Sequence, residues 1–284
     1  MIMPRPDNVR RRNIRGRLLA ALTVVGLAAG FESSSYAGAP LGLFSAGALG
    51  QVAGGTIKGR LVWGGDQAPE AKDLIAKGKS EKDPGVCAKD AAIPDESLVV
   101  DPKTKGIKNA IVYLVKPTKD NPEAVKALVA KAPQVEIDQQ NCRFIPRSTV
   151  LHADQVVVFK ATDQTNHNVH LSGFATANSS NQLLPPGGQM QKKLEADRRP
   201  IPLTCDIHPW MKGSIMVFEH PYFAVTGEDG SFQIDGVPPG TQNLVIWQEL
   251  VGYVNEGLAK GMPVNVAGAA DVGVIKLDPA KVKK

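Results

Sequence analysis

The stretch Cys205–Met211, with the sequence CDIHPWM, carries most of the chemical information in this chain. A thiol, an imidazole and a thioether lie on it at the spacing C-x-x-H-x-x-M. A second imidazole stands upstream at His167, in the segment NHNVH. One cysteine, two histidines and a weakly bound methionine are the ligands of a trigonal copper site that transfers electrons. The pattern therefore predicts one mononuclear copper centre.

The spacing of these residues suits a turn between two strands. If Cys205 ends one strand and Met211 begins the next, the turn directs three side chains toward one point. His167 would then close the site from a different strand. Thiolate is a soft donor and imidazole binds both oxidation states of copper, so little rearrangement would accompany electron transfer.

The three cysteines of the chain limit the disulfide pairing. An odd number in an exported protein leaves one thiol unpaired. We expect Cys205 to bind metal and Cys87 to pair with Cys142, which closes a loop worth about 4 kcal/mol on the chain-entropy model. The alternatives, Cys87–Cys205 and Cys142–Cys205, would remove the thiolate ligand.

The N-terminal residues have the pattern of an export signal. An arginine-rich start is followed by an apolar core from Leu18 to Ala29 and then by small residues up to Ala37. We expect a signal peptide over residues 1–37, with an uncleaved anchor as the alternative, and a Gly/Ala-rich flexible tail over residues 38–53. The mature protein would be periplasmic or secreted, and no later segment is apolar and long enough for a stable membrane span.

The charge of the chain argues against nucleic-acid binding. Of the formal net charge of +5, residues 1–37 account for +4 through six arginines and two acids. The remainder carries only +1, so it offers no basic surface for a phosphate backbone.

The remaining sequence predicts an all-β fold. Short β-branched runs at residues 110–115, 156–159 and 214–218 are typical of buried strands in a sandwich. Asn121 and Pro122 predict one short inserted helix that ends near Lys131. The polar stretch Asp66–Pro84 suggests a further helix or a surface excursion.

The pattern changes after residue 220. Asp229-Gly230 between two alternating runs predicts a β-hairpin. Further short strands follow up to residue 277. We therefore expect a copper domain over residues 54–220 and a small C-terminal β-sandwich or sheet extension over residues 221–284.

The two metal motifs, residues 166–170 and Cys205–Met211, resemble those of the cupredoxins, the blue type 1 copper proteins. The loop is most similar to the plastocyanin/amicyanin-like members, and the resemblance implies a Greek-key β-sandwich. It also implies that the Asn168 N–H donates to the Cys205 sulfur while the Asn168 side chain joins the two motifs. The implied copper ligands are His167, Cys205, His208 and Met211.

The same resemblance implies an exported carrier that passes single electrons between transiently bound redox partner proteins. Asp206 would lie beside the thiolate. Pro209 and Trp210 would form an apolar docking rim around His208, the ligand that usually reaches the surface in this family. The region after residue 220 resembles transthyretin-like domains, a generic scaffold that brings no catalytic residues.

Other functions remain open at this point. A copper-handling module without an electron-carrier role is one, and a surface binding protein is another. An enzyme is disfavoured, because a multicopper oxidase needs paired His-x-His motifs and a binuclear purple-copper centre needs two cysteines on the loop. We therefore expect no catalytic activity.

Overall fold

The computed structural model describes residues 54–255 and 260–282, all within the second of two compact units, Leu49–Lys284. The expected signal peptide and flexible tail lie outside the described residues. Within the described part of the chain, none of the helices has the length and apolar character needed to cross a membrane.

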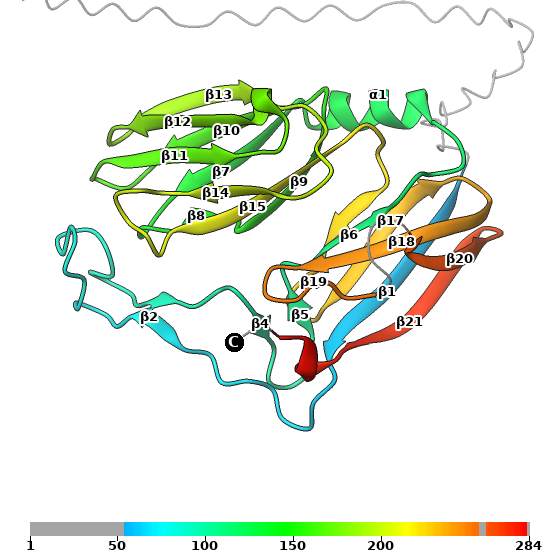
Figure 1. Ribbon diagram of the computed structural model, residues 1–284, viewed down its shortest axis with the longest axis horizontal. Helices are drawn as coiled ribbons and strands as arrows, with labels where there is room; N and C mark the ends of the chain where they lie inside the picture. The colour runs from blue at the N-terminus through cyan, green and yellow to red at the C-terminus, as the bar shows by residue number, and fades with distance from the viewer. Residues whose placement is uncertain (1–53, 256–259, 283–284) are drawn as a thin grey trace, which may run out of the picture. The chain divides into compact units, whose positions relative to one another are not determined.

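Two sheets form the first sandwich (Figure 1, green to yellow), and the five-stranded one carries both metal motifs. The five-stranded sheet runs in the order β12 (Ser179–Leu184), β11 (His167–Ser172), β14 (Ile201–Thr204), β15 (Lys212–Phe218) and β9 (Ser148–His152). The four-stranded sheet runs in the order β13 (Gln189–Lys193), β10 (Val156–Ala161), β7 (Gln134–Gln139) and β8 (Phe144–Ile145).

This first sandwich has its own hydrophobic cluster. Inward side chains of both sheets meet there, among them Phe159, Leu171 and Ile215, each at most 1% exposed. Two pairings, β15 with β9 and β10 with β7, are parallel and join strands that do not follow one another in the chain. The expected all-β sandwich is confirmed.

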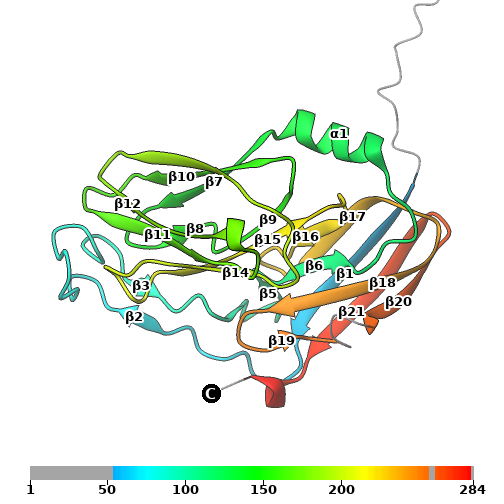
Figure 2. The ribbon, with the colours of Figure 1, turned by 45° about the horizontal axis from the view of Figure 1, so that its top comes forward.

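Two further sheets form a second sandwich (Figure 2). One has the order β17 (Ser231–Val237), β1 (Gly55–Trp63) and β21 (Ala269–Leu277). The other has the order β16 (Phe223–Val225), β6 (Ile111–Leu114), β18 (Gly240–Gln248) and β19 (Gly252–Tyr253), with β20 (Met262–Val266) also paired to β18.

The second sandwich corrects the boundary expected at residue 220. Strand β1 runs parallel to β21, from Thr56 beside Ala269 to Trp63 beside Leu277, and β6 lies between β16 and β18. Its hydrophobic cluster therefore contains residues of the expected copper domain, such as Ile57 and Val112. These pairings join residues far apart in the chain, which no local pattern reveals.

The hairpin expected at Asp229-Gly230 is also wrong. The chain does reverse there, with the Gly227 N–H donating to the Ser231 carbonyl at 2.9 Å and Gly230 at φ +79°. The flanking strands, however, belong to different sheets: β16 pairs with β6 and β17 with β1. Turn residues therefore determine where the chain reverses, but they do not determine which strands pair.

The inserted helix is confirmed as α1 (Pro122–Lys131), with the Asn121 side chain accepting from the Ala124 N–H at 3.0 Å. The polar stretch Asp66–Pro84 contains the short strand β2 (Asp73–Ile75) and no helix. Three more short strands follow it: β3 (Ile93–Pro94), β4 (Val99–Val100) and β5 (Ile107–Lys108). Two 3-10 turns complete the described elements, η1 (Thr176–Asn178) and η2 (Pro279–Lys281).

The two sandwiches share a small apolar cluster. Tyr113 of β6 and Phe218 of β15 have ring centroids 5.0 Å apart, and Val245 of β18 joins them. Beside this cluster the Arg147 guanidinium makes two 2.7 Å bonds to the Glu249 carboxylate.

Candidate metal centre

The predicted metal loop is the connection between two antiparallel strands. Cys205 follows directly on β14 and Met211 directly precedes β15. The loop closes on itself, because the Cys205 N–H donates to the Met211 carbonyl at 3.3 Å and the Met211 N–H donates to the His208 carbonyl at 2.9 Å. His167 is the first residue of β11, which pairs with β14. Sheet pairing therefore brings the two motifs together.

Three of the predicted ligands converge in the protein interior. The Nδ1 atoms of His167 and His208 lie 3.0 Å apart, and His208 Nδ1 lies 3.7 Å from Cys205 Sγ. Ligand atoms of all three residues lie within 4.8 Å of one another, and both imidazoles are fully buried. Met211, the fourth predicted ligand, is buried in the hydrophobic cluster that also contains Cys205. The structure thus contains a candidate metal site where the sequence predicts one.

Each imidazole is held from behind by a carboxylate. His167 Nε2 lies 2.9 Å from an Asp163 oxygen, and His208 Nε2 lies 2.7 Å from an Asp83 oxygen. A carboxylate accepts only from a protonated nitrogen, so these contacts place the ring proton on Nε2. In each ring Nδ1 is then the nitrogen that faces the other predicted ligands, the arrangement that orients histidine ligands and raises their basicity.

Neither carboxylate was predicted from the sequence. Asp163 stands four residues before His167, so a search for acids near the motif could have found it. Asp83 is 125 positions from His208 and gives no local signal.

The surroundings of Cys205 favour its thiolate form. The Asn168 N–H donates to Cys205 Sγ at 3.5 Å, the contact that the resemblance implies. Burial alone would raise the pKa of Cys205, but hydrogen bonds with His167 and His208 outweigh it and lower that pKa to about 6. Burial is the largest single influence and lowers the pKa of His167, but the contacts with Asp163 and Cys205 together outweigh it and raise this pKa to about 9. A thiolate beside cationic or metal-bound imidazole is therefore favoured at neutral pH.

The Asn168 side chain joins the two motifs. Its oxygen accepts from the Asp206 N–H at 2.6 Å, and its nitrogen donates to an Asp206 carboxylate oxygen at 3.1 Å. The other Asp206 oxygen contacts His170 Nδ1 at 2.8 Å, and this contact is the main reason that the pKa of Asp206 is lowered. His170 therefore pairs with Asp206 on the outside of the loop, apart from the converging ligands.

The disulfide lies against the same site. Cys87 is bonded to Cys142, and Cys205 is free, which is the expected pairing among the three alternatives. Both disulfide sulfurs lie within 4.8 Å of a His208 ring nitrogen. The Asp163 carboxylate that holds His167 also accepts from the Cys142 N–H at 2.7 Å.

The rim around His208 differs from the expectation. His208 is 0% exposed rather than reaching the surface, with Asp83 at its Nε2 and the Cys87–Cys142 disulfide close to its ring. Pro209 is exposed, while Trp210 is only partly exposed. The Trp210 ring centroid lies 5.2 Å from that of His208, and its Nε1–H donates to the Cys142 carbonyl at 3.1 Å. Trp210 thus has a packing role between the loop and the disulfide.

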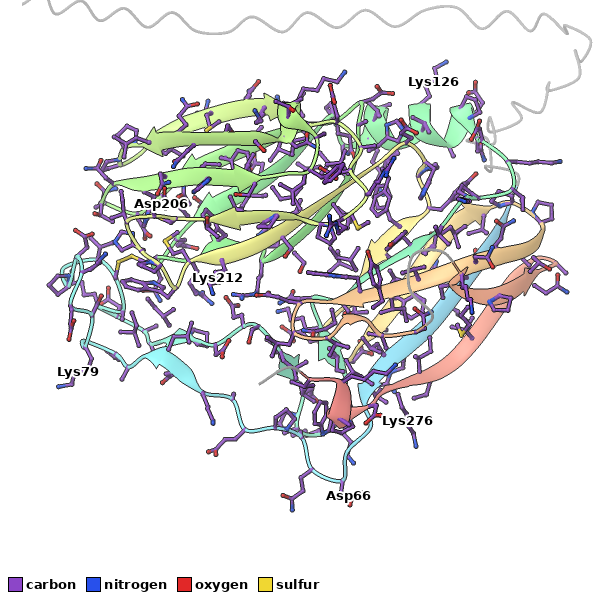
Figure 3. All side chains as sticks on the ribbon, in the orientation of Figure 1. Asp66, Lys79, Lys126, Asp206, Lys212 and Lys276 are labelled. Atoms are coloured by element: carbon purple, nitrogen blue, oxygen red, sulfur yellow. A yellow bond between two sulfur atoms is a disulfide. The ribbon has the colours of Figure 1, made fainter. Side chains whose placement is uncertain are left out.

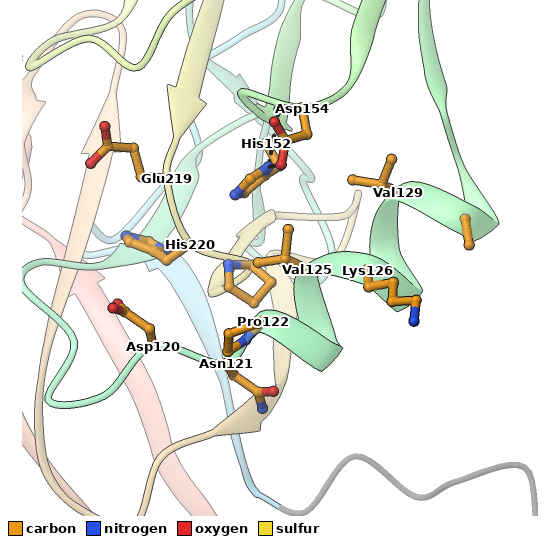
Figure 4. A pocket seen from close by; sticks show the side chains of 12 residues that line it. Asp120, Asn121, Pro122, Val125, Lys126, Val129, His152, Asp154, Glu219 and His220 are labelled. Atoms are coloured by element: carbon orange, nitrogen blue, oxygen red, sulfur yellow. Dashed lines mark hydrogen bonds and ion pairs between the residues drawn. The ribbon is translucent and has the colours of Figure 1, made fainter.

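A cavity of about 670 Å³ lies elsewhere, between α1 and the segment that leads from β15 to β16 (Figure 4). His152 and His220 line it together with carboxylates such as Asp120. Burial lowers the pKa of His220 to about 4. None of the predicted metal ligands lines this cavity.

Comparison with known proteins returns cupredoxins among solved structures. A copper-containing nitrite reductase from Thermus scotoductus is 20% identical over 30% of this chain and 22% of its own, with a TM-score of 0.28. Amicyanin from Paracoccus versutus is 17% identical over 31% and 83%, with a TM-score of 0.27. A purple cupredoxin from Nitrosopumilus maritimus is 16% identical over 30% and 99%, with a TM-score of 0.25. No family model and no curated protein matches the chain.

Proposed function

We propose that this chain is a cupredoxin-like protein that binds one copper ion and passes single electrons between redox partners. The observation that carries the proposal is the convergence of Cys205 Sγ with the Nδ1 atoms of His167 and His208 in a buried site. Met211 would complete the set as a weak axial ligand.

The donor set fits copper on physical grounds. The lowered pKa of Cys205 supplies a thiolate, and the two aspartates hold both rings by Nε2. The raised pKa of His167 keeps a proton on its Nδ1, which a bound metal would displace. Copper bound there would supply a one-electron couple. The surrounding chain would hold its ligands in place, which keeps reorganisation small when the charge changes.

Further parts of the proposal follow from the ligand count. With one thiolate, two imidazoles and one thioether directed at the ion, no position is left for a substrate, so we assign no catalytic activity. A redox partner would bind transiently near Pro209, an exposed residue of the loop. We place the mature protein in the periplasm or outside the cell, where the Cys87–Cys142 disulfide is stable. The transthyretin-like character of the second sandwich is likewise a proposal.

One observation favours a second candidate function, a copper-handling module. An electron carrier usually presents a ligand edge to its partner, but His208 is fully covered. A covered site would help to retain the copper ion, which is what a copper-handling module requires.

Redox cycling separates the two candidates. Copper-loaded protein would be reduced and reoxidised repeatedly with small-molecule donors and acceptors, with Cys205→Ser as the control. An electron carrier exchanges one electron per copper, quickly and reversibly, and keeps its copper. Slow exchange, or loss of the ion in each cycle, would favour copper handling and contradict the carrier function.

A further inference from the structure

We propose that Asp83 is a positioning residue for His208, and that residues 78–94, here called the cap, close the metal centre and limit exchange of its ion. This inference rests on the proposed function for the identity of the ion, but its structural part stands on metal-free geometry. In Figure 1 the cap belongs to the cyan segment that follows β2.

The first observation is the contact between the cap and a ligand. An Asp83 oxygen lies 2.7 Å from His208 Nε2, on the side of the ring opposite Nδ1. The Asp83 side chain is 39% exposed, while that of His208 is 0% exposed. Asp83 therefore stands between the ligand and solvent. At this edge of the ring, a molecule that approaches His208 meets the carboxylate first.

The second observation is that Asp83 sits in a tight turn. Its carbonyl accepts from the N–H groups of Val86 and Cys87, both at 2.8 Å. Its φ of +46° lies in the left-handed region, which aspartate tolerates better than most residues. This turn fixes the carboxylate relative to Cys87, so that the disulfide and the His208 contact act on one short segment.

The third observation is the attachment of the cap to the sandwich. The Cys87–Cys142 disulfide joins it to the turn between β7 and β8. In the same turn, the Asn141 side chain accepts from the Ala88 N–H at 3.1 Å. Next to Asp83, Lys82 Nζ donates to the Ile207 carbonyl within the metal loop at 2.8 Å. In Figure 3 the disulfide appears as a yellow bond where the cyan segment meets the first sandwich.

These contacts have different consequences for ions and for electrons. An ion can leave only if a ligand moves away, and His208 can swing outward only if Asp83 and the cap move with it. An electron needs no such opening. The cap therefore retains the ion and leaves the one-electron chemistry intact. It also accounts for the burial of His208, which lies at the edge of the sandwich.

The test compares two substitutions of the same kind within the cap. Asp83→Asn removes the charge behind His208. Asp90→Asn removes an exposed charge of the cap that forms no hydrogen bond or ion pair with the described residues of the site. Asp83→Ala removes the acceptor as well. The rate of copper loss to a chelator would be measured at chelator concentrations where the rate no longer depends on the chelator.

Copper loss from Asp83→Ala should be about 10-fold faster or more, the scale on which partners behind metal ligands act. Asp83→Asn should lie between this variant and Asp90→Asn, which should match the wild type. A double Cys87→Ala, Cys142→Ala variant should also lose copper faster if it folds. Equal rates of copper loss for the Asp83 and Asp90 variants would contradict the proposal that the cap limits exchange of the ion.

A second readout needs no metal. In the metal-free protein, nitrogen NMR of the His208 ring should show the proton on Nε2 in the wild type and in Asp90→Asn. Asp83→Ala should shift this signal or mix the two tautomers, and an unchanged signal would contradict the positioning role. A wild type that binds no copper but shows this dependence would refute the proposed function and leave the role of Asp83 standing.

Discussion

The two sandwiches bury different kinds of side chain. The second cluster is apolar apart from the Tyr222 hydroxyl, which is buried without a hydrogen-bond partner among the described residues. Thr226, also buried, is paired, because its hydroxyl donates to the Ile107 carbonyl at 2.7 Å. The first cluster borders a fully buried group of imidazoles and a thiol whose Nδ1 and Sγ atoms face one another. Polar groups in a low-dielectric interior stabilise only when fully paired. The first sandwich thus gives up apolar packing to hold donors for a ligand, and the second does not.

The largest effect should follow from removing the thiolate. Cys205→Ser should abolish the thiolate-to-copper absorption band and weaken copper binding strongly, because a hydroxyl is neither soft nor ionised at neutral pH. The change is nearly isosteric, so circular dichroism should stay unchanged. An intense band that persists in the variant would mean that the first sandwich does not owe its polar interior to copper.

Loss of the disulfide should affect stability next most strongly. Replacing Cys87 and Cys142 by alanine opens a loop of 55 positions, so the free energy of unfolding should fall by about 4 kcal/mol. Denaturant unfolding measures this fall. If the variant is as stable as the wild type, the first sandwich does not need its covalent link to compensate for its polar interior.

A core substitution in the second sandwich should lower stability without affecting copper binding. Ile246 of β18 is fully buried, and Ile246→Ala should cost about 3 kcal/mol through lost contacts and a cavity. Copper affinity and the visible spectrum should stay unchanged, as a parallel metal titration would show. A changed spectrum would reveal coupling between the two sandwiches through their shared apolar cluster.

The smallest effect concerns pH. Burial lowers the pKa of His220 to about 4, below an unfolded value near 6.5, so the unfolded state binds the proton more readily. Above pH 6.5 the neutral form predominates in both states, so His220 should not affect stability there. Between pH 6.5 and 4 stability should fall by roughly 3 kcal/mol. His220→Gln should remove this part of the pH dependence. Parallel stability curves for both proteins would contradict the burial of a neutral His220.

Local chemistry made part of this structure predictable. Asn121 and Pro122 define the start of α1, because the Asn121 side chain accepts from the Ala124 N–H only three residues later. The Cys205–Met211 spacing defines the metal loop for the same reason: its side chains share one turn. The Cys87–Cys142 pairing could be predicted because it is the one pairing that leaves Cys205 free to bind metal.

Long-range contacts account for what could not be predicted. The pairing of β1 with β21 and the contact of Asp83 with His208 join distant parts of the chain, and their sequence patterns are those of an ordinary strand and an ordinary surface loop. The buried state of His208 depends on that second contact. It therefore differed from the exposed edge that the family resemblance implied.

The most direct test of the central claim is a visible absorption and EPR spectrum of the protein after loading with Cu(II). An intense blue or green band with narrow copper hyperfine splitting would establish a thiolate–copper bond at Cys205, as the account predicts. A pale spectrum with wide splitting would mean an ordinary nitrogen–oxygen site and would contradict it.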